Sequence, residues 1–244
     1  MATAEATRSS LIPFRNVYVY FVLLVPATVI AFSKSYFAGE TFSGRPATVL
    51  VHVHTALMTL WLLMLITQAW LIRTKRFRPH RWVGRSSFIA APVIVLSALA
   101  VQHEQFNHSA EVISPEDARI AVFAFGQALA FAVTWGLAIV YRRQASLHLR
   151  FMISTAFAVS TAILFRILLS WVPRFDSLES VAAANWLLLT LSLLALIAAD
   201  WRNGMTRSPF WVVTVLIGIM HLGFWTFAKT AGWLAFTEWY ARLL

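Results

Sequence analysis

The chain has 244 residues, of which 59% are hydrophobic and only 12% are charged, and its mean hydropathy is +0.71. Apolar runs long enough to cross a bilayer recur throughout, so this composition excludes a soluble globular protein. It predicts an all-α, polytopic membrane bundle that forms a single transmembrane helical domain over residues 1–244. The absence of cysteine excludes disulfides, iron–sulfur clusters, thiolate metal sites and covalently attached c-type haem.

The formal net charge of +10 does not indicate nucleic-acid binding, because the basic residues gather in short loops between apolar runs. In such loops they set topology and contact anionic head groups. The predicted polyanionic partner is therefore the phospholipid bilayer.

The N-terminal segment MATAEATRSSLIPFRN leads directly into an apolar run and lacks a small-x-small cleavage site, so we expect a retained signal-anchor. After the last span, WLAFTEWYARLL places aromatic residues at helical spacing and predicts either an interfacial amphipathic helix or a continuation of that span. Seven spans are expected, at about Val17–Ser33, Thr48–Ile72, Ser86–Gln102, Ala118–Tyr141, Phe151–Val172, Val181–Ala199 and Phe210–Phe227.

The distribution of Lys and Arg orients the predicted spans through the positive-inside rule. One set of loops holds thirteen of these residues: Arg8, Arg15, Arg73, Lys75, Arg76, Arg78, Arg81, Arg85, Arg142, Arg143, Arg150, Arg202 and Arg207. The other set holds six: Lys34, Arg45, Arg119, Arg174, Lys229 and Arg242. We therefore expect a cytoplasmic N-terminus and an external C-terminus.

The second span, VLVHVHTALMTLWLLMLITQ, carries two histidines near its external end. Ionisable groups at membrane depth are costly, so they usually face the bundle interior and mark functional sites. His52 and His54 project about 200° apart on a straight helix and do not readily bind one ion together. His54 shares a stripe with Met58, Trp61 and Gln68; the sequence does not decide which of the two histidines faces the bundle, and we favour His54.

Further polar residues are predicted to reach the same outer half of the bundle from other spans. Arg166 and His221 lie on faces rich in small residues, which mark the packed side of a membrane helix. Imidazoles without thiolates suit haem b, copper, iron or zinc. The expected metal ligands are His54 and His221, with His52 as the alternative and His103 on the same side. The other expected cofactor-binding residues are Arg166, as partner of an anionic group, and Gln127 and Asn185.

The loop RTKRFRPHRWVGRSS is predicted to form a tight, strongly basic turn between the second and third spans. Its Gly84 allows either a close helix approach or a positive φ. A second basic segment, RRQASLHLRF, lies on the same side of the membrane. We expect lipid or anion contact there, with a head group, a phosphate-bearing ligand or an inner haem, from His80, Arg81, Arg85, His148 and Arg150.

Three functions follow from these residues, and the sequence does not decide whether the protein is an enzyme. The first is redox chemistry at a haem or transition metal in the outer leaflet, with a small anionic or quinone-like ligand as a further partner. The second is a cofactor-free transporter, channel or assembly subunit, acting as a homo-oligomer or within a membrane complex. The third is a zinc-dependent membrane hydrolase, for which Glu104 is the nearby carboxylate.

The segments HVHTALMTLWLLMLITQAWLI, HRWVGRSSFIAAPVIVLS and LHLRFMISTAFAVSTAILFRI resemble an uncharacterised group of bacterial inner-membrane proteins. That group shares a histidine-bearing second span, a His-Arg-x-x-Gly-Arg or Lys loop, and a later helix that closes with an arginine. The resemblance covers about Leu50 to Ile167 and implies a multi-pass protein of the bacterial inner membrane. The chain is more loosely similar to membrane cytochromes b, and to the haemolysin III and adiponectin-receptor hydrolases, although it lacks the HxxxH of the latter.

Overall fold

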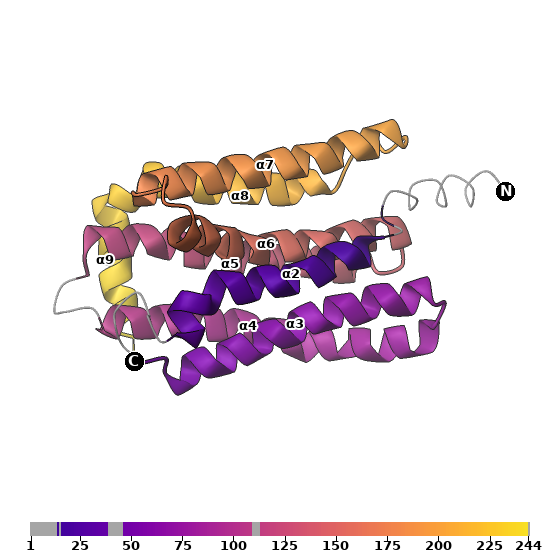
Figure 1. Ribbon diagram of the computed structural model, residues 1–244, viewed down its shortest axis with the longest axis horizontal. Coiled ribbons are helices and arrows are strands. Elements are labelled where there is room, and N and C mark those ends of the chain that lie inside the picture. Colours follow the sequence, from indigo (N-terminus) through magenta and orange to yellow (C-terminus); the bar gives the residue numbers. More distant parts are fainter. Residues whose placement is uncertain (1–13, 15, 39–45, 109–112, 244) are drawn as a thin grey trace.

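The computed structural model describes residue 14 and residues 16–38, 46–108 and 113–243 (Figure 1). Most of the expected signal-anchor segment, together with Arg8, Arg15 and Arg45, lies outside these ranges. Within them the chain is helical. The helices are α2 (Val17–Phe32), a π-helix η2 (Ser33–Phe37), α3 (Val49–Arg73), α4 (Phe77–His108), α5 (Pro115–Val140), α6 (Ala145–Trp171), α7 (Leu178–Arg202), α8 (Phe210–Trp225), the 3-10 helix η3 (Phe227–Lys229) and α9 (Ala231–Ala241).

Seven of these helical segments are long and apolar enough to cross a membrane, which confirms the predicted polytopic all-α bundle. The described residues form no β-strand. Several helices begin where a side chain accepts a backbone N–H of the first turn: Thr48 from Val51, Ser114 from Asp117, and Ser177 from Ser180. These caps satisfy amide groups that have no partner within the helix.

The long helices run side by side, whereas α9 lies across one end of the bundle (Figure 1). The C-terminal segment is therefore a separate helix and not a continuation of the seventh span. Helices α3 and α4 form a hairpin, and α6 packs against α2, α5, α7 and α8. Gly126 allows the close packing of α5 on α8, because a Cβ there would clash with the Met220 side chain.

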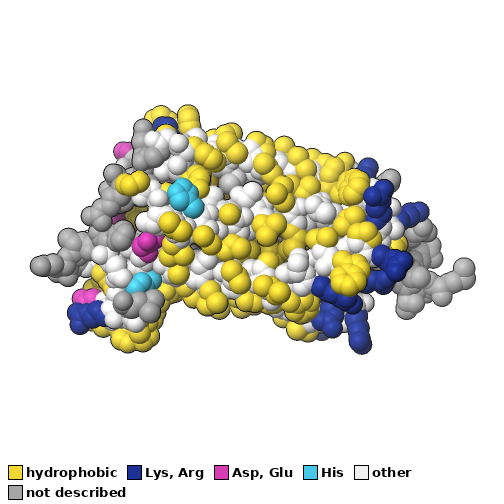
Figure 2. Space-filling view, turned by 90° about the horizontal axis from the view of Figure 1, so that it is seen from below, with side chains coloured by type: hydrophobic (Ala, Val, Ile, Leu, Met, Phe, Trp, Pro, Cys, Tyr) yellow, Lys and Arg dark blue, Asp and Glu magenta, His cyan; other side chains and the backbone are white. Residues whose placement is uncertain are grey.

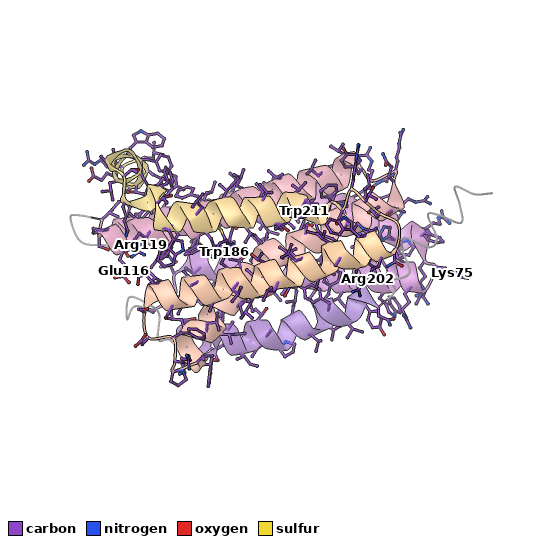
Figure 3. All side chains as sticks on the ribbon, turned by 90° about the horizontal axis from the view of Figure 1, so that it is seen from above. Lys75, Glu116, Arg119, Trp186, Arg202 and Trp211 are labelled. Carbon is purple, nitrogen blue, oxygen red and sulfur yellow. The ribbon has the colours of Figure 1, made fainter. Side chains whose placement is uncertain are left out.

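A broad apolar band covers the middle of the face in Figure 2, while Lys and Arg side chains gather at one end. We call that end, which holds Lys75 and Arg202, the basic end (Figure 3). Glu116 and Arg119 lie toward the other end, which we call the opposite end. An apolar girdle between two polar ends is the surface expected of a protein in contact with a lipid bilayer.

The third span differs most from its prediction, because α4 begins at Phe77 and not near Ser86. His80, Arg81, Gly84 and Arg85 therefore lie on the first turns of α4 and not in a turn between spans. The turn is made by residues 74–76, and the positive φ belongs to Lys75, at 59°. Gly84 serves close approach instead, since a Cβ there would stand 3.0 Å from Nε2 of Gln68.

Candidate functional site

His52 and His54 face different surroundings, as their spacing predicts. His52 is exposed, and its Nδ1 lies 2.6 Å from the Tyr36 hydroxyl. His54 is half-buried, and its Nδ1 lies 2.9 Å from Oγ of Ser97 on α4. Ser97 donates its own proton to the Ile94 carbonyl, so it accepts from Nδ1–H of His54. This tautomer leaves a lone pair on Nε2, and His54 is the inward-facing histidine.

Arg166 and His221 occupy separate parts of the bundle. Arg166 lies over the Phe32 ring at 4.4 Å and is close enough to His54 for its positive charge to act on that imidazole. His221 is fully buried, with its ring centroid 5.0 Å from that of Phe123 and 6.3 Å from that of Trp186. The contacts of His54 are with α4 and α6, whereas those of His221 are with α5 and α7. Arg166 thus lies near His54, whereas the ring contacts of His221 are with other helices.

The other residues predicted for the outer half of the bundle each have different neighbours. His103 is buried against the Tyr240 ring at 5.5 Å, with its Nδ1 near the Asn107 amide. Glu104 accepts a hydrogen bond from Thr48. Gln127 is half-buried on α5, and Asn185 donates from Nδ2 to the Thr161 carbonyl. Among the described residues, no group of three or more His, Cys, Asp or Glu could hold a metal ion.

Arg150, predicted to contact lipid or an anion, is fully buried and binds Asp200 instead. Its Nε donates to both Asp200 oxygens at 2.9 Å, and its Nη2 donates to Oδ1 at 2.6 Å. Ser208 donates to Oδ2 of Asp200, while Ser146 accepts from Nη1 of Arg150. This network ties α6 to α7 and to Ser208, two residues before α8. It satisfies two charges that would otherwise be very costly to bury.

His80 and His148, by contrast, form a pair whose hydrogen-bonding capacity is not used up. They come from the first turns of α4 and α6, and His148 lies close enough to His80 for its charge to act on it. His148 donates from Nδ1 to the Ala138 carbonyl at 2.8 Å, which leaves the lone pair on its Nε2. Nδ1 of His80 is buried and has no hydrogen-bond partner. These two imidazoles are the pair of predicted site histidines that the structure brings together.

Gln68, a residue that the sequence did not single out, completes this group. Its Nε2 donates to the His80 carbonyl at 3.0 Å, while its Oε1 is buried without a partner. A hydrogen bond from Nδ1–H of His80 to this oxygen would satisfy both of these buried atoms. Both imidazoles would then be held by Nδ1 and would present Nε2, an arrangement typical of metal-ligating histidines. We call Gln68, His80 and His148 the histidine pair site.

The surroundings of the histidine pair site are open and basic. Just after Ala138, a shallow hollow of about 350 Å³ is lined by Ile139, Val140, Arg142 and Arg143. The charge of Arg81 also acts on His80. A bare divalent cation would be repelled by these guanidinium groups, whereas a ligand that carries carboxylates would be attracted.

The chain matches no protein-family model, no curated protein and no solved structure. The fold and these sites thus define a class, a seven-span membrane protein with buried polar groups at both ends. Any particular function has to be inferred from the chemistry of those groups.

Proposed function

We propose that the protein is a redox protein of the membrane that binds haem b at its basic end, with His80 and His148 as ligands. The observation that supports this most is the tautomer of His148, whose Nδ1–H is bound to a backbone carbonyl and whose Nε2 keeps its lone pair. A neutral imidazole of this kind, oriented by a carbonyl, suits ligation of a metal. His80 lies beside it on another helix, so the two can act on one ligand.

The charges around the pair favour haem over a free metal ion. Haem carries two propionates, and Arg81, Arg142 and Arg143 supply the guanidinium groups that bind carboxylates well. A free divalent ion would meet the same positive groups, and the described part of the chain adds no carboxylate to the two imidazoles to offset them. The anion bound near His80 and His148 would thus be the haem propionates, which Arg81 and the exposed Arg85 would help to bind.

The residues of the site would each have a defined task. His80 and His148 would hold the iron, and Gln68 would fix the His80 ring through its Oε1. Gly84 would keep the space that the Gln68 amide occupies. When bound, a haem held by protein ligands supplies one-electron transfer at a potential that the ligands and their hydrogen bonds tune.

The test is the absorbance spectrum of the detergent-purified protein, produced in cells supplied with a haem precursor. We expect a Soret band, about one haem per chain by pyridine haemochrome, and stoichiometric iron by elemental analysis. His52→Ala serves as a matched control, because His52 is exposed at the other end of the bundle. Absence of a Soret band in protein that is folded and monodisperse would overturn the proposal.

A cofactor-free transporter is the second candidate, and the closeness of Arg166 to His54 favours it. A guanidinium beside an imidazole with a free Nε2 lone pair would couple binding of an anion to uptake of a proton. Proton-dependent anion flux into liposomes should then be abolished in Arg166→Gln and retained in Arg174→Gln. Equal flux in the two variants would exclude this role for Arg166.

We further propose that the basic end faces the cytoplasm of a bacterium, as the positive-inside rule predicts. The chain has no cysteine, so single cysteines can report on each end. A membrane-impermeant maleimide added to whole cells should label Glu238→Cys on α9 and should leave Arg143→Cys unlabelled. The reverse pattern would invert the orientation.

A further inference from the structure

A second group of buried polar atoms lies between α5, α7 and α8, toward the opposite end. Its centre is His221, which is fully buried and has no hydrogen-bond partner at either ring nitrogen. Its ring lies against those of Phe123 and Trp186. An unsatisfied buried polar group is destabilising, so such atoms call for a ligand or water.

Asn185 adds an acceptor at the same level. Its Nδ2 is bound to the Thr161 carbonyl, but its Oδ1 is buried without a partner. It directly precedes Trp186, whose ring lies 6.3 Å from that of His221 at an interplanar angle of 25°. Asn185 and His221 thus come from neighbouring helices at one depth.

Arg119 adds donors nearer the end of the bundle. Its Nη1 binds Glu179 at 2.6 Å, whereas its buried Nε and Nη2 have no hydrogen-bond partner. Its guanidinium lies 4.3 Å from the Phe224 ring, which stacks 4.9 Å from Phe123. Along α7, Glu179 and Asn185 are six residues apart, which corresponds to about 9 Å. We call Arg119, Asn185 and His221 the opposite-end polar group.

The hydrogen-bonding pattern of this group selects a chemical class of ligand. Arg119 offers only donors, the free oxygen of Asn185 only accepts, and a neutral imidazole offers one of each. A metal ion would be repelled by Arg119, and an anion would face the lone pairs of Asn185. A neutral ligand with hydroxyl groups at both ends of a flat ring satisfies all three residues, and its ring would suit the Phe123, Trp186 and Phe224 side chains.

We propose that the opposite-end polar group binds the head group of a membrane-dissolved quinol. The hydroxyl groups would donate to Asn185 and His221 and accept from Arg119. The side chain of Trp186 is 44% exposed on the lipid-facing side of α7, so the head group would enter from the bilayer beside it. A quinone has no hydroxyl to give to Asn185, so the reduced form binds more tightly. This site is separate from the histidine pair site and does not depend on haem.

Anaerobic titration with decylubiquinol and decylubiquinone in nanodiscs tests the proposal, with quenching of tryptophan fluorescence as the readout. We expect saturable quenching that is largely lost in Trp186→Phe and retained in Trp211→Phe, a control near the basic end (Figure 3). Binding should be about tenfold tighter for the quinol, since one unsatisfied acceptor is worth about 1.4 kcal/mol or more. Asn185→Leu should remove that preference, and His221→Leu should abolish binding in protein with an unchanged unfolding temperature.

Two results would overturn the quinol site. One is quenching that does not saturate, and the other is equal quenching in wild type and Trp186→Phe. The buried atoms would then be satisfied by water. Because the readout needs no haem, either result leaves the proposal for the histidine pair site untouched, and loss of that proposal leaves this one standing.

Discussion

Arg150 and His148 are two residues apart on α6, yet their side chains differ in burial and in how fully they are hydrogen-bonded. Arg150 is fully buried and each of its described contacts is with a matching group, Asp200 and Ser146 among them. His148 is only half-buried, is bound through Nδ1 to the Ala138 carbonyl, keeps a lone pair on Nε2, and lies near His80. A buried charge with a matching ion-pair partner indicates a role in stabilising the fold. A free lone pair beside another imidazole indicates a ligand site.

The largest effect should follow from breaking the ion pair. Asp200→Ala leaves the Arg150 guanidinium buried without its carboxylate, so we expect a loss of about 3–5 kcal/mol in the free energy of unfolding. Thermal unfolding in detergent, followed by tryptophan fluorescence, measures it. The double variant Arg150→Met with Asp200→Leu should recover much of the loss, because it leaves no buried charge. A wild-type unfolding temperature in Asp200→Ala would show that the pair does not stabilise the fold.

A smaller effect is expected at Ser208, which donates to Oδ2 of Asp200 at 2.6 Å. Ser208→Ala removes a hydrogen bond to a charged group, for which we expect a loss of about 1.5–3 kcal/mol. Ser192→Ala is the matched control, because its hydroxyl is exposed and bonds only within its own helix. Equal unfolding temperatures for the two variants would contradict the account.

Gln68→Leu tests the role of the histidine pair site. It removes only the hydrogen bond from Nε2 to the His80 carbonyl, because Oε1 has no partner, so the haem-free protein should lose about 0.5–1.5 kcal/mol in the free energy of unfolding. Haem affinity should fall about 10- to 100-fold, as when an outer hydrogen bond to a ligating histidine is removed. Haem titration of Gln68→Leu and of Gln127→Leu measures this, and the control should bind as wild type. A stability loss as large as that of Ser208→Ala would mean that the amide is already satisfied.

The smallest effect concerns α9, which lies across the opposite end. Tyr240 donates its hydroxyl to the Leu99 carbonyl, and burial raises the pKa of Tyr240 above its ordinary value. Its contribution to stability is present below the ordinary tyrosine pKa and is lost as pH rises through the folded one. Above about pH 10 the stability difference between wild type and Tyr240→Phe should therefore shrink. A constant difference up to pH 11, measured by urea unfolding in detergent, would contradict this.

Most of the fold was predictable because the apolar runs of the sequence have the length that a helix needs to cross a bilayer. The predicted bounds of every span except the third and fifth lie within about three residues of the observed helices, and the fifth span, α6, begins six residues earlier than predicted, at Ala145. The third span was wrong at its start, because arginines are compatible with the first turns of a helix at the head-group level. No helix-breaking residue separates Phe77 from Ser86, since Pro79 lies in the first turn, where proline is tolerated.

Side-chain contacts between helices were much less predictable, because hydropathy does not show which residues of two helices face each other. The sequence favoured His54 over His52 as the inward-facing histidine without deciding between them, and it gave no sign of the bond to Ser97. Asp200 left a signal that could have been used, as it and Glu5 are the acidic residues on the basic side of the predicted topology. Gln68 gave none, because a single amide at the end of a span has no pattern.

The most direct test is electron paramagnetic resonance of the oxidised, haem-loaded protein in wild type, His80→Ala, His148→Ala and His52→Ala. We expect a low-spin signal typical of two imidazole ligands in wild type and His52→Ala, and a high-spin signal or no haem in the other two variants. An unchanged low-spin signal in His148→Ala would contradict the assignment. Loss of the signal in His54→Ala or His221→Ala instead would move the haem to the opposite half of the bundle.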